Sequence, residues 1–155
     1  MRKIFTVTLL FMLIFRLHGQ NIDQPVEAPF EQLKVVGNIR LILVPSDVQA
    51  LKFEAGQDLE ALTVESKEGK LLLKTKSELN KDPALKGRLL YRSITHIEVT
   101  KGGHVQSSDT IRTKVLFLKA ETGGKAEVKV NANRLLDSNA TSKATVGYWG
   151  EKLFS

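Results

Sequence analysis

The chain has 155 residues, of which 42% are hydrophobic and 26% are charged, and its formal net charge is +6. This length is enough for one domain with a single modest core. The chain contains no cysteine, which excludes disulfide bonds and a lipid-modified cysteine. The fold must therefore be held by packing and backbone hydrogen bonds.

The first nineteen residues are typical of a secretory signal peptide. Arg2 and Lys3 give a basic start, and residues 4–15 are apolar apart from two threonines. This apolar run is too short to cross a bilayer, which needs ~20 residues. We expect cleavage between Gly19 and Gln20, and an exported protein that is periplasmic or extracellular and not a lipoprotein. The alternative is an N-terminal membrane anchor.

Removal of the signal peptide lowers the net charge of the mature chain. Arg2, Lys3 and Arg16 leave with it, which leaves +3 (6 − 3). The other basic residues mostly alternate with apolar ones, as on a solvated sheet face, without interleaved aromatic residues. A nucleic-acid partner is therefore not expected, and membrane contact is expected only during export.

Residues 20–29 are predicted to be a linker, followed by a single domain over residues 30–155. From Phe30 onward, apolar and polar residues alternate with a period of two, which predicts half-buried β-strands. The alternating segments are 33–43, 51–55, 62–67, 71–74 and 89–99. Gly, Asn, Asp or Pro lies between them, where turns need these residues.

Two segments break this alternation. The only helix that the sequence allows here is a single turn over residues 58–62, capped by Asp58. Residues 77–87 are polar, contain Pro83, and are predicted to be a loop between two strand-rich halves.

Small-residue corners recur in the C-terminal half of the chain. Gly102-Gly103 and Gly123-Gly124 lie 21 residues apart, and a third corner at 141–143 lacks glycine. A repeat of short strands without helices predicts an all-β fold, a short right-handed parallel β-helix. The glycines are structural, because the chain turns sharply where the next coil stacks directly above. The alternative is an antiparallel β-sandwich with Gly-Gly hairpins.

The alternation also predicts which side chains point inward in these coils. Glu98, Lys114, Lys119, Glu127 and Lys129 are expected to point outward. The expected inward positions are Ile97, Val99, Val105, Val115, Phe117, Val128, Val130, Leu135, Ala144 and Val146.

Several motifs resemble one family. The segments are Phe30-x-x-Leu-Lys-Val-Val-Gly-Asn-Ile-Arg-Leu-Ile-Leu, Glu68-Gly-Lys-Leu-Leu-Leu-Lys, the Gly-Gly-x-x-Val corners and Asn131-Ala-Asn-Arg-Leu. They resemble the "putative auto-transporter adhesin, head GIN domain" family of exported bacterial proteins over most of residues 30–150. The resemblance implies a parallel β-helix in the periplasm or at the cell surface, and it supplies no catalytic residues. The glycine-free third corner departs from the family's pattern.

The sequence offers no strong catalytic, cofactor or metal signature. His96 and His104 lack the further ligands that a metal site needs. Acid–base catalysis needs two carboxyl groups within ~5–10 Å. The acidic residues of the coils are instead spread over different coil positions; they are Glu98, Asp109, Glu121 and Glu127. We therefore expect no catalytic residue, metal or cofactor.

Two further features bear on partners. Tyr148 and Trp149 could cap the last coil or contact a partner, and Asp109-Thr110-Ile111 resembles a short O-glycosylation acceptor at Thr110. The sequence thus predicts an exported, non-enzymatic, adhesin-like module that binds envelope glycan or protein. The alternative is a carbohydrate-active enzyme on the same fold.

Overall fold

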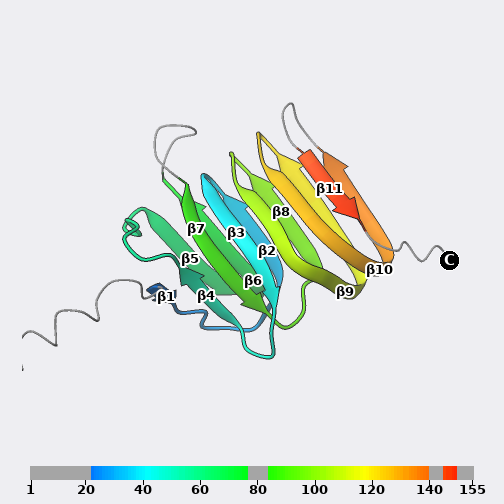
Figure 1. Cartoon of the computed structure of the whole chain (residues 1–155), viewed down its shortest axis with the longest axis horizontal. Coiled ribbons are helices and arrows are strands. Elements are labelled where there is room, and N and C mark those ends of the chain that lie inside the picture. Colours follow the sequence, from blue (N-terminus) through cyan, green and yellow to red (C-terminus); the bar gives the residue numbers. More distant parts are fainter. Residues whose placement is uncertain (1–21, 77–83, 140–144, 150–155) are drawn as a thin grey trace, which may run out of the picture.

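A computed structural model describes the backbone of residues 22–76, 84–139 and 145–149, and this part of the chain is all-β. The strands form one mixed sheet of eleven (Figure 1). They are β1 (Ile22–Gln24), β2 (Phe30–Val36), β3 (Ile39–Pro45), β4 (Ala50–Phe53), β5 (Leu62–Lys67), β6 (Gly69–Thr75), β7 (Leu85–Tyr91), β8 (His96–Thr100), β9 (His104–Glu121), β10 (Lys125–Asn139) and β11 (Thr145–Trp149).

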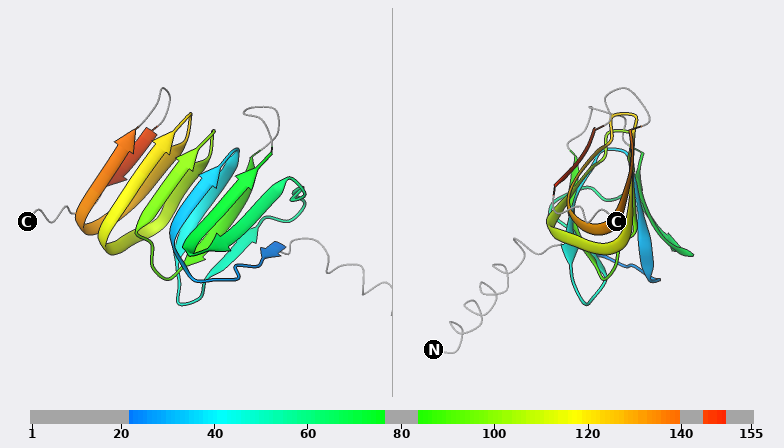
Figure 2. Two further views of the ribbon diagram at one scale, coloured as in Figure 1. Left: turned by 180° about the vertical axis from the view of Figure 1, so that it is seen from behind. Right: turned by 90° about the vertical axis from the view of Figure 1, so that its right-hand side faces the viewer.

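Parallel pairing dominates the sheet. Of the ten strand pairings in the described residues, seven are parallel, and the antiparallel ones are β1–β4, β4–β7 and β5–β6. All three involve strands at the N-terminal end of the stack (Figure 1). This pattern does not fit an antiparallel sandwich. Seen along the stack, the strands wrap the core in a nearly closed ring (Figure 2).

The sheet presents two outer faces. On one, the first part of β9 lies beside β3, which continues to β7 and β4; we call this the β3 face. On the other, the second part of β9 lies beside β8, which continues to β2, β6 and β5; we call this the β2 face. The strand β10 follows β9 along both faces, and β11 pairs with the start of β10.

The 21-residue spacing of the glycine pairs is also the offset between paired strands. His104 lies opposite Lys125, and His96 lies opposite Phe117, so both offsets are 21 (125 − 104 and 117 − 96). At the corners, the Gly102 N–H donates to the Thr122 carbonyl at 3.2 Å, and the Lys125 N–H donates to the Gly103 carbonyl at 2.8 Å. The two Gly-Gly corners are thus hydrogen-bonded to each other.

The two glycines of each corner have different roles. In the turn after β8, Lys101 and Gly102 have φ values of 54° and 82°, and the Gly103 N–H donates back to the Thr100 carbonyl at 3.3 Å. Positive φ at both central residues defines a type I′ turn, which favours glycine at the second position. Gly103 is required for space instead, because a Cβ there would lie 2.9 Å from Val99 Cγ1.

The core lies between the two faces. Leu33 and Leu71 reach it from the β2 face, and Leu41 and Leu89 reach it from the β3 face, all with at most 1% of their surface exposed. Burying one such side chain stabilises the fold by about 1.5–3 kcal/mol. Ile97, Val99, Val105, Val128 and Val130 are buried as predicted.

The predicted inward orientation of Val115 and Phe117 is wrong. Val115 is 41% exposed, and Leu116 and Leu118 are buried in their place. Between Ile111 and Leu116, the strand β9 passes from one face to the other, and the inward positions change from odd to even numbers. A shift of one residue moves every later side chain to the opposite face.

Three predicted boundaries also need correction. Residues 85–87 belong to β7, so the loop predicted over 77–87 ends earlier, and its residues 77–83 lie outside the described ranges. Residues 22–24 of the predicted linker form β1. No helical turn forms over 58–62; the Glu60 N–H donates instead to Asp58 Oδ1 at 2.9 Å, which makes a local turn.

Candidate functional site

A groove of about 450 Å³ crosses the β3 face. Among the described residues that line it, four side chains are cationic and Glu54 is the single carboxylate. The lining residues are Arg40, Leu41, Ile42, Lys52, Glu54, Lys86, Gly87, Arg88, His104 and Gln106. We call this feature the basic groove.

Strand register places like charges directly opposite one another in the basic groove. Arg40 on β3 faces Lys86 on β7, and Lys52 on β4 faces Arg88 on β7. Like charges at such positions destabilise a sheet. Lys52 reaches Asp23 at 3.8 Å, whereas no described carboxylate forms an ion pair with Arg40, Lys86 or Arg88.

A glycine–phenylalanine contact fixes the cations on β4 and β7. Phe53 is fully buried, and its ring occupies the place where a side chain at Gly87 would lie, 2.9 Å from the ideal Cβ position. The two residues are directly opposed across the antiparallel pairing. Lys52 and Arg88 are the neighbours of Phe53 and Gly87 along their strands. Because side chains alternate along a strand, the side chains of Lys52 and Arg88 are directed outward.

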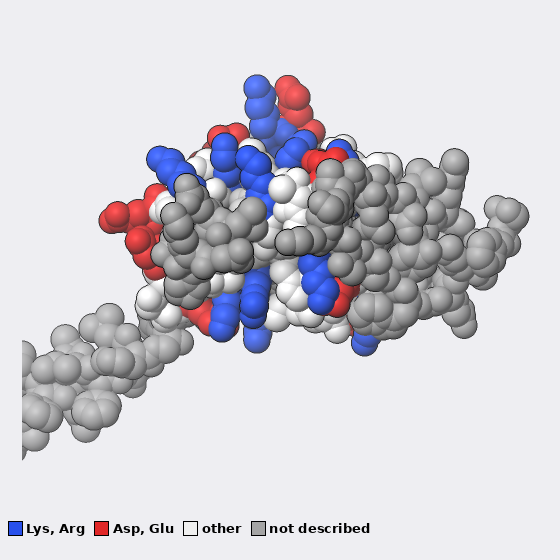
Figure 3. Space-filling model, turned by 90° about the horizontal axis from the view of Figure 1, so that it is seen from above, with Lys and Arg blue, Asp and Glu red and all other residues white. Residues whose placement is uncertain are grey.

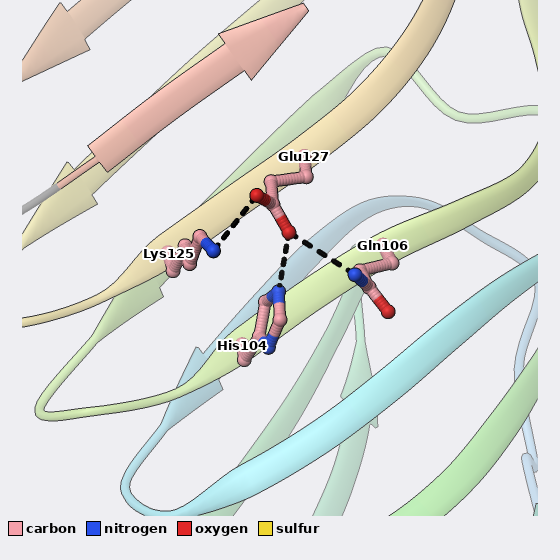
Figure 4. A network of polar contacts seen from close by, with 4 residues as sticks. All are labelled: His104, Gln106, Lys125 and Glu127. Atoms are coloured by element: carbon pink, nitrogen blue, oxygen red, sulfur yellow. Dashed lines mark hydrogen bonds and ion pairs between the residues drawn. The ribbon is translucent and has the colours of Figure 1, made fainter.

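A polar network lies beside the basic groove, between β9 and β10 (Figure 4). Glu127 Oε2 contacts His104 Nε2 at 2.8 Å and accepts a hydrogen bond from Gln106 Nε2 at 3.1 Å. Glu127 Oε1 is 2.8 Å from Lys125 Nζ. The hydrogen bonds from Lys125, His104 and Gln106 lower the pKa of Glu127 to about 2. This carboxylate therefore stays charged and holds His104 and Gln106 in place.

The β2 face pairs its charges differently. Lys34, Glu98 and Lys119 lie opposite one another on three adjacent strands, with Glu98 Oε1 2.9 Å from Lys34 Nζ and 4.0 Å from Lys119 Nζ. Burial alone would raise the pKa of Glu98, but the hydrogen bond from Lys34 and the charges of Lys34, Lys119 and Lys70 lower it. Opposite charges therefore alternate across the centre of this face. Seen from above, Lys and Arg side chains project along both long sides of the molecule, and Asp and Glu are interspersed among them (Figure 3).

The two histidines in the described part of the chain, His96 and His104, lie on different faces. His96 stacks on Phe117 on the β2 face, with ring centroids 4.6 Å apart and an interplanar angle of 18°. This stacking explains why Phe117 points outward. Burial lowers the pKa of His96 below its usual range. In the described part of the chain, no group of three His, Asp or Glu side chains could hold a metal ion.

The structure separates most of the residues that the sequence singled out. The glycine pairs at 102–103 and 123–124 lie in turns outside the lining of the basic groove. Thr110 lies in β9, and its N–H donates to Asp109 Oδ1 at 2.6 Å. Tyr148 and Trp149 belong to β11, of which the structure describes the backbone only. Gly19 and Gln20 lie outside the described residues.

Sequence reasoning missed the basic groove. Its cations lie at positions 40, 52, 86 and 88, and only the β4–β7 and β7–β3 pairings bring them together. Each belongs to an alternating strand, where a basic residue is the usual solvent-facing choice. The sequence does indicate that these four residues face outward, because polar residues in these strands alternate with inward-facing apolar residues. That they lie together could be recognised only once the order of the strands in the sheet was known.

Comparison with known proteins places the chain in a family. Residues 29–151 match the family described as "Putative auto-transporter adhesin, head GIN domain". The chain belongs to this family. No curated protein matches it in sequence.

Two solved structures have a similar fold. One, from Bacteroides fragilis, is described as a "putative adhesin" and has a TM-score of 0.65 at 13% identity, covering 75% of this chain and 56% of that one. A second "putative adhesin", from Parabacteroides merdae, has a TM-score of 0.53 at 12% identity, with coverage of 75% and 51%. The chain therefore spans about half the length of these relatives, and at such identities the likeness concerns the fold.

Proposed function

We propose that this chain is an exported, non-enzymatic binding domain of the cell envelope or surface, built as a short right-handed parallel β-helix. The observation that carries the function is membership of an adhesin family over residues 29–151. The parallel pairing of strands at an offset of 21 residues supports the β-helix. Both support the domain as a rigid platform whose outer faces meet a partner.

Export and location form part of the same proposal. The basic start and apolar run of the first nineteen residues support a signal peptide cut before Gln20, and the family's adhesin description supports the periplasm or the cell surface. Within the described residues, no helix is long and apolar enough to span a bilayer. Amino-terminal sequencing of the chain recovered after export tests this point, with Gln20 expected as the first residue.

A capture experiment tests the binding role. The full chain, produced in an exporting host and immobilised, is incubated with envelope fractions and with purified envelope glycans. Retention of a glycan or an envelope protein above a blank support is expected. Failure to retain material from any fraction would refute the proposed function. Unchanged capture by Trp149→Ala would remove Trp149 from the binding surface.

One observation favours a second candidate, a carbohydrate-active enzyme. A hollow of about 520 Å³ beside β5 is lined by both Glu27 and Glu65, and two nearby carboxyl groups are what glycoside hydrolysis requires. Both side chains are exposed to solvent, whereas the catalytic acid of such enzymes lies in apolar surroundings. Polysaccharide hydrolysis that Glu65→Gln abolishes would establish this candidate in place of the binding role.

A further inference from the structure

The arrangement of charge on the β3 face points to a ligand class. We propose that the basic groove binds an acidic polysaccharide, with Arg40, Lys86 and Arg88 contacting its anionic groups. This inference rests on the proposed function and specifies the partner of the binding domain.

The first support is an uncompensated electrostatic cost. Arg40 faces Lys86 and Lys52 faces Arg88 across paired strands, and directly opposed like charges destabilise a sheet. On the β2 face, the central row of Lys34, Glu98 and Lys119 alternates in charge, and the opposed cations Lys67 and Lys70 lie away from this centre, on the outermost strand pair β5–β6. A departure from favourable patterning at one place is typical of a functional site. An anionic ligand would remove the repulsion.

The second support is the linear arrangement of the cations. One row across the strands contains Lys86, Arg40 and His104, and the next contains Lys52, Arg88, Ile42 and Gln106. Neighbouring strands lie about 4.8 Å apart, so the first row is a line of polar groups running along the stack, and the second is polar apart from Ile42. Such a line suits an extended polymer with repeated anions.

The third support is the chemistry of the lining. The guanidinium groups of Arg40 and Arg88 can each hold a carboxylate or sulfate through two parallel hydrogen bonds. Gln106 and His104, fixed by Glu127, add polar groups that suit sugar hydroxyls. The groove on the β2 face, about 370 Å³, has lysines as its only cationic lining residues.

The same lining argues against two other polyanions. Among the described residues, no Phe, Tyr or Trp side chain lines the basic groove, whereas proteins that bind single-stranded nucleic acid stack bases on aromatic rings. Membrane binding needs an inserted apolar surface, and the only large exposed apolar side chain in the lining is Ile42, at 37% exposure.

The test compares two variants of equal charge on the two faces. The first is Arg40→Gln/Lys86→Gln/Arg88→Gln, and the second is Lys67→Gln/Lys70→Gln/Lys74→Gln, which changes exposed residues of β5 and β6. Binding of the full chain to polygalacturonate is measured by calorimetry, with neutral dextran, a single-stranded oligonucleotide and anionic lipid vesicles as rival probes.

We expect the first variant to bind polygalacturonate about tenfold more weakly, because it loses three charge-assisted contacts, while the second changes affinity less than about threefold. Wild-type binding should be weakened by added salt and absent for dextran. The first variant should melt at or above the wild-type temperature, because it removes opposed like charges, so weakened binding cannot be ascribed to unfolding.

The inference is overturned if the two variants lose affinity equally, or if dextran, the oligonucleotide or the vesicles bind as well as polygalacturonate. It is also overturned if the wild-type chain captures envelope material but ignores polygalacturonate, and in that case the proposed function still stands. If the chain captures no envelope material, the proposed function itself fails.

Discussion

In the corner after β9, Gly124 should tolerate substitution less well than Gly123. An ideal Cβ at Gly124 would lie 2.6 Å from the Val99 carbonyl carbon and closer still to its oxygen, and 3.0 Å from the Glu121 oxygen. These atoms belong to the backbone and cannot rotate away. Gly123 has a φ of 75°, but its nearest neighbour would be 3.9 Å away.

The two positions therefore separate steric exclusion from backbone strain. Gly123→Ala should cost about 1–2 kcal/mol, the usual penalty for a left-handed residue with a Cβ. Gly124→Ala must push the strand β8 away from the corner, and we expect about 3 kcal/mol, at the upper end of overpacking effects. With a urea m-value of about 1.5 kcal/mol/M, the midpoint would fall by about 2 M.

Urea unfolding followed by far-UV circular dichroism measures both variants on the full chain. The m-value should be unchanged, so that the midpoint reports stability alone. Gly103→Ala provides an intermediate case, because its closest neighbours are the side chains of Val99 and Val35, which can move. The steric argument is refuted if Gly124→Ala is no more destabilised than Gly123→Ala.

Three other predictions follow from contacts near the groove and on the β2 face. Phe53→Ala should cost about 3–5 kcal/mol in urea unfolding, because a fully buried ring is lost over Gly87; a loss below 1 kcal/mol would contradict the packing. The lowered pKa of Glu127 stabilises the fold above pH 4.5, and this contribution is lost as pH falls toward about 2. Glu127→Gln should therefore flatten the stability profile in that range, and an unchanged profile would refute the network. The pKa of His96, measured by NMR, should lie below 6.5, so the folded state becomes less stable as pH falls below that value. Phe117→Ala should move this pKa back toward 6.5. No movement would exclude shielding of His96 by Phe117.

The sequence carried most of the information on strands and corners. Alternation located the strands, because a sheet with one buried face imposes a period of two. The 21-residue spacing of Gly102 and Gly123 equals the offset between paired strands, because stacked corners must coincide. Family membership was also predicted from motifs such as Phe30–Leu43 and is confirmed by the match over residues 29–151.

The groove and the phase of β9 could not be predicted in the same way. The antiparallel pairing of β4 with β7 joins residues more than 30 positions apart, such as Lys52 and Arg88 (88 − 52 = 36), and local patterns contain no such information. The pairing of β9 with β10 also contains a bulge. Gln106 lies opposite Glu127 (offset 21), but Thr110 lies opposite Lys129 (offset 19), so β9 has two more residues than β10 in this stretch. This two-residue bulge leaves the inward positions odd, from Val105 to Ile111, and the phase changes only in the bend between Ile111 and Leu116, which turns Val115 outward.

The pairing of β2 and β3 has a consequence for how the chain acquires its structure during synthesis. Leu33 on β2 pairs with Leu71 on β6 and Ile97 on β8, at separations of 38 (71 − 33) and 64 (97 − 33) residues. Leu41 on β3 similarly pairs with Gly87 on β7 and Val105 on β9, at 46 (87 − 41) and 64 (105 − 41) residues.

Until β8 and β9 have been synthesised, β2 and β3 each present an open hydrogen-bonding edge lined by apolar side chains. Such edges invite pairing with other chains. Closing a 64-residue segment rather than a 21-residue one costs about 1 kcal/mol of additional chain entropy. The strands β2 and β3 are thus made early but keep one edge unpaired until β8 and β9 have been synthesised, and a chain kept unfolded until export would avoid this exposure.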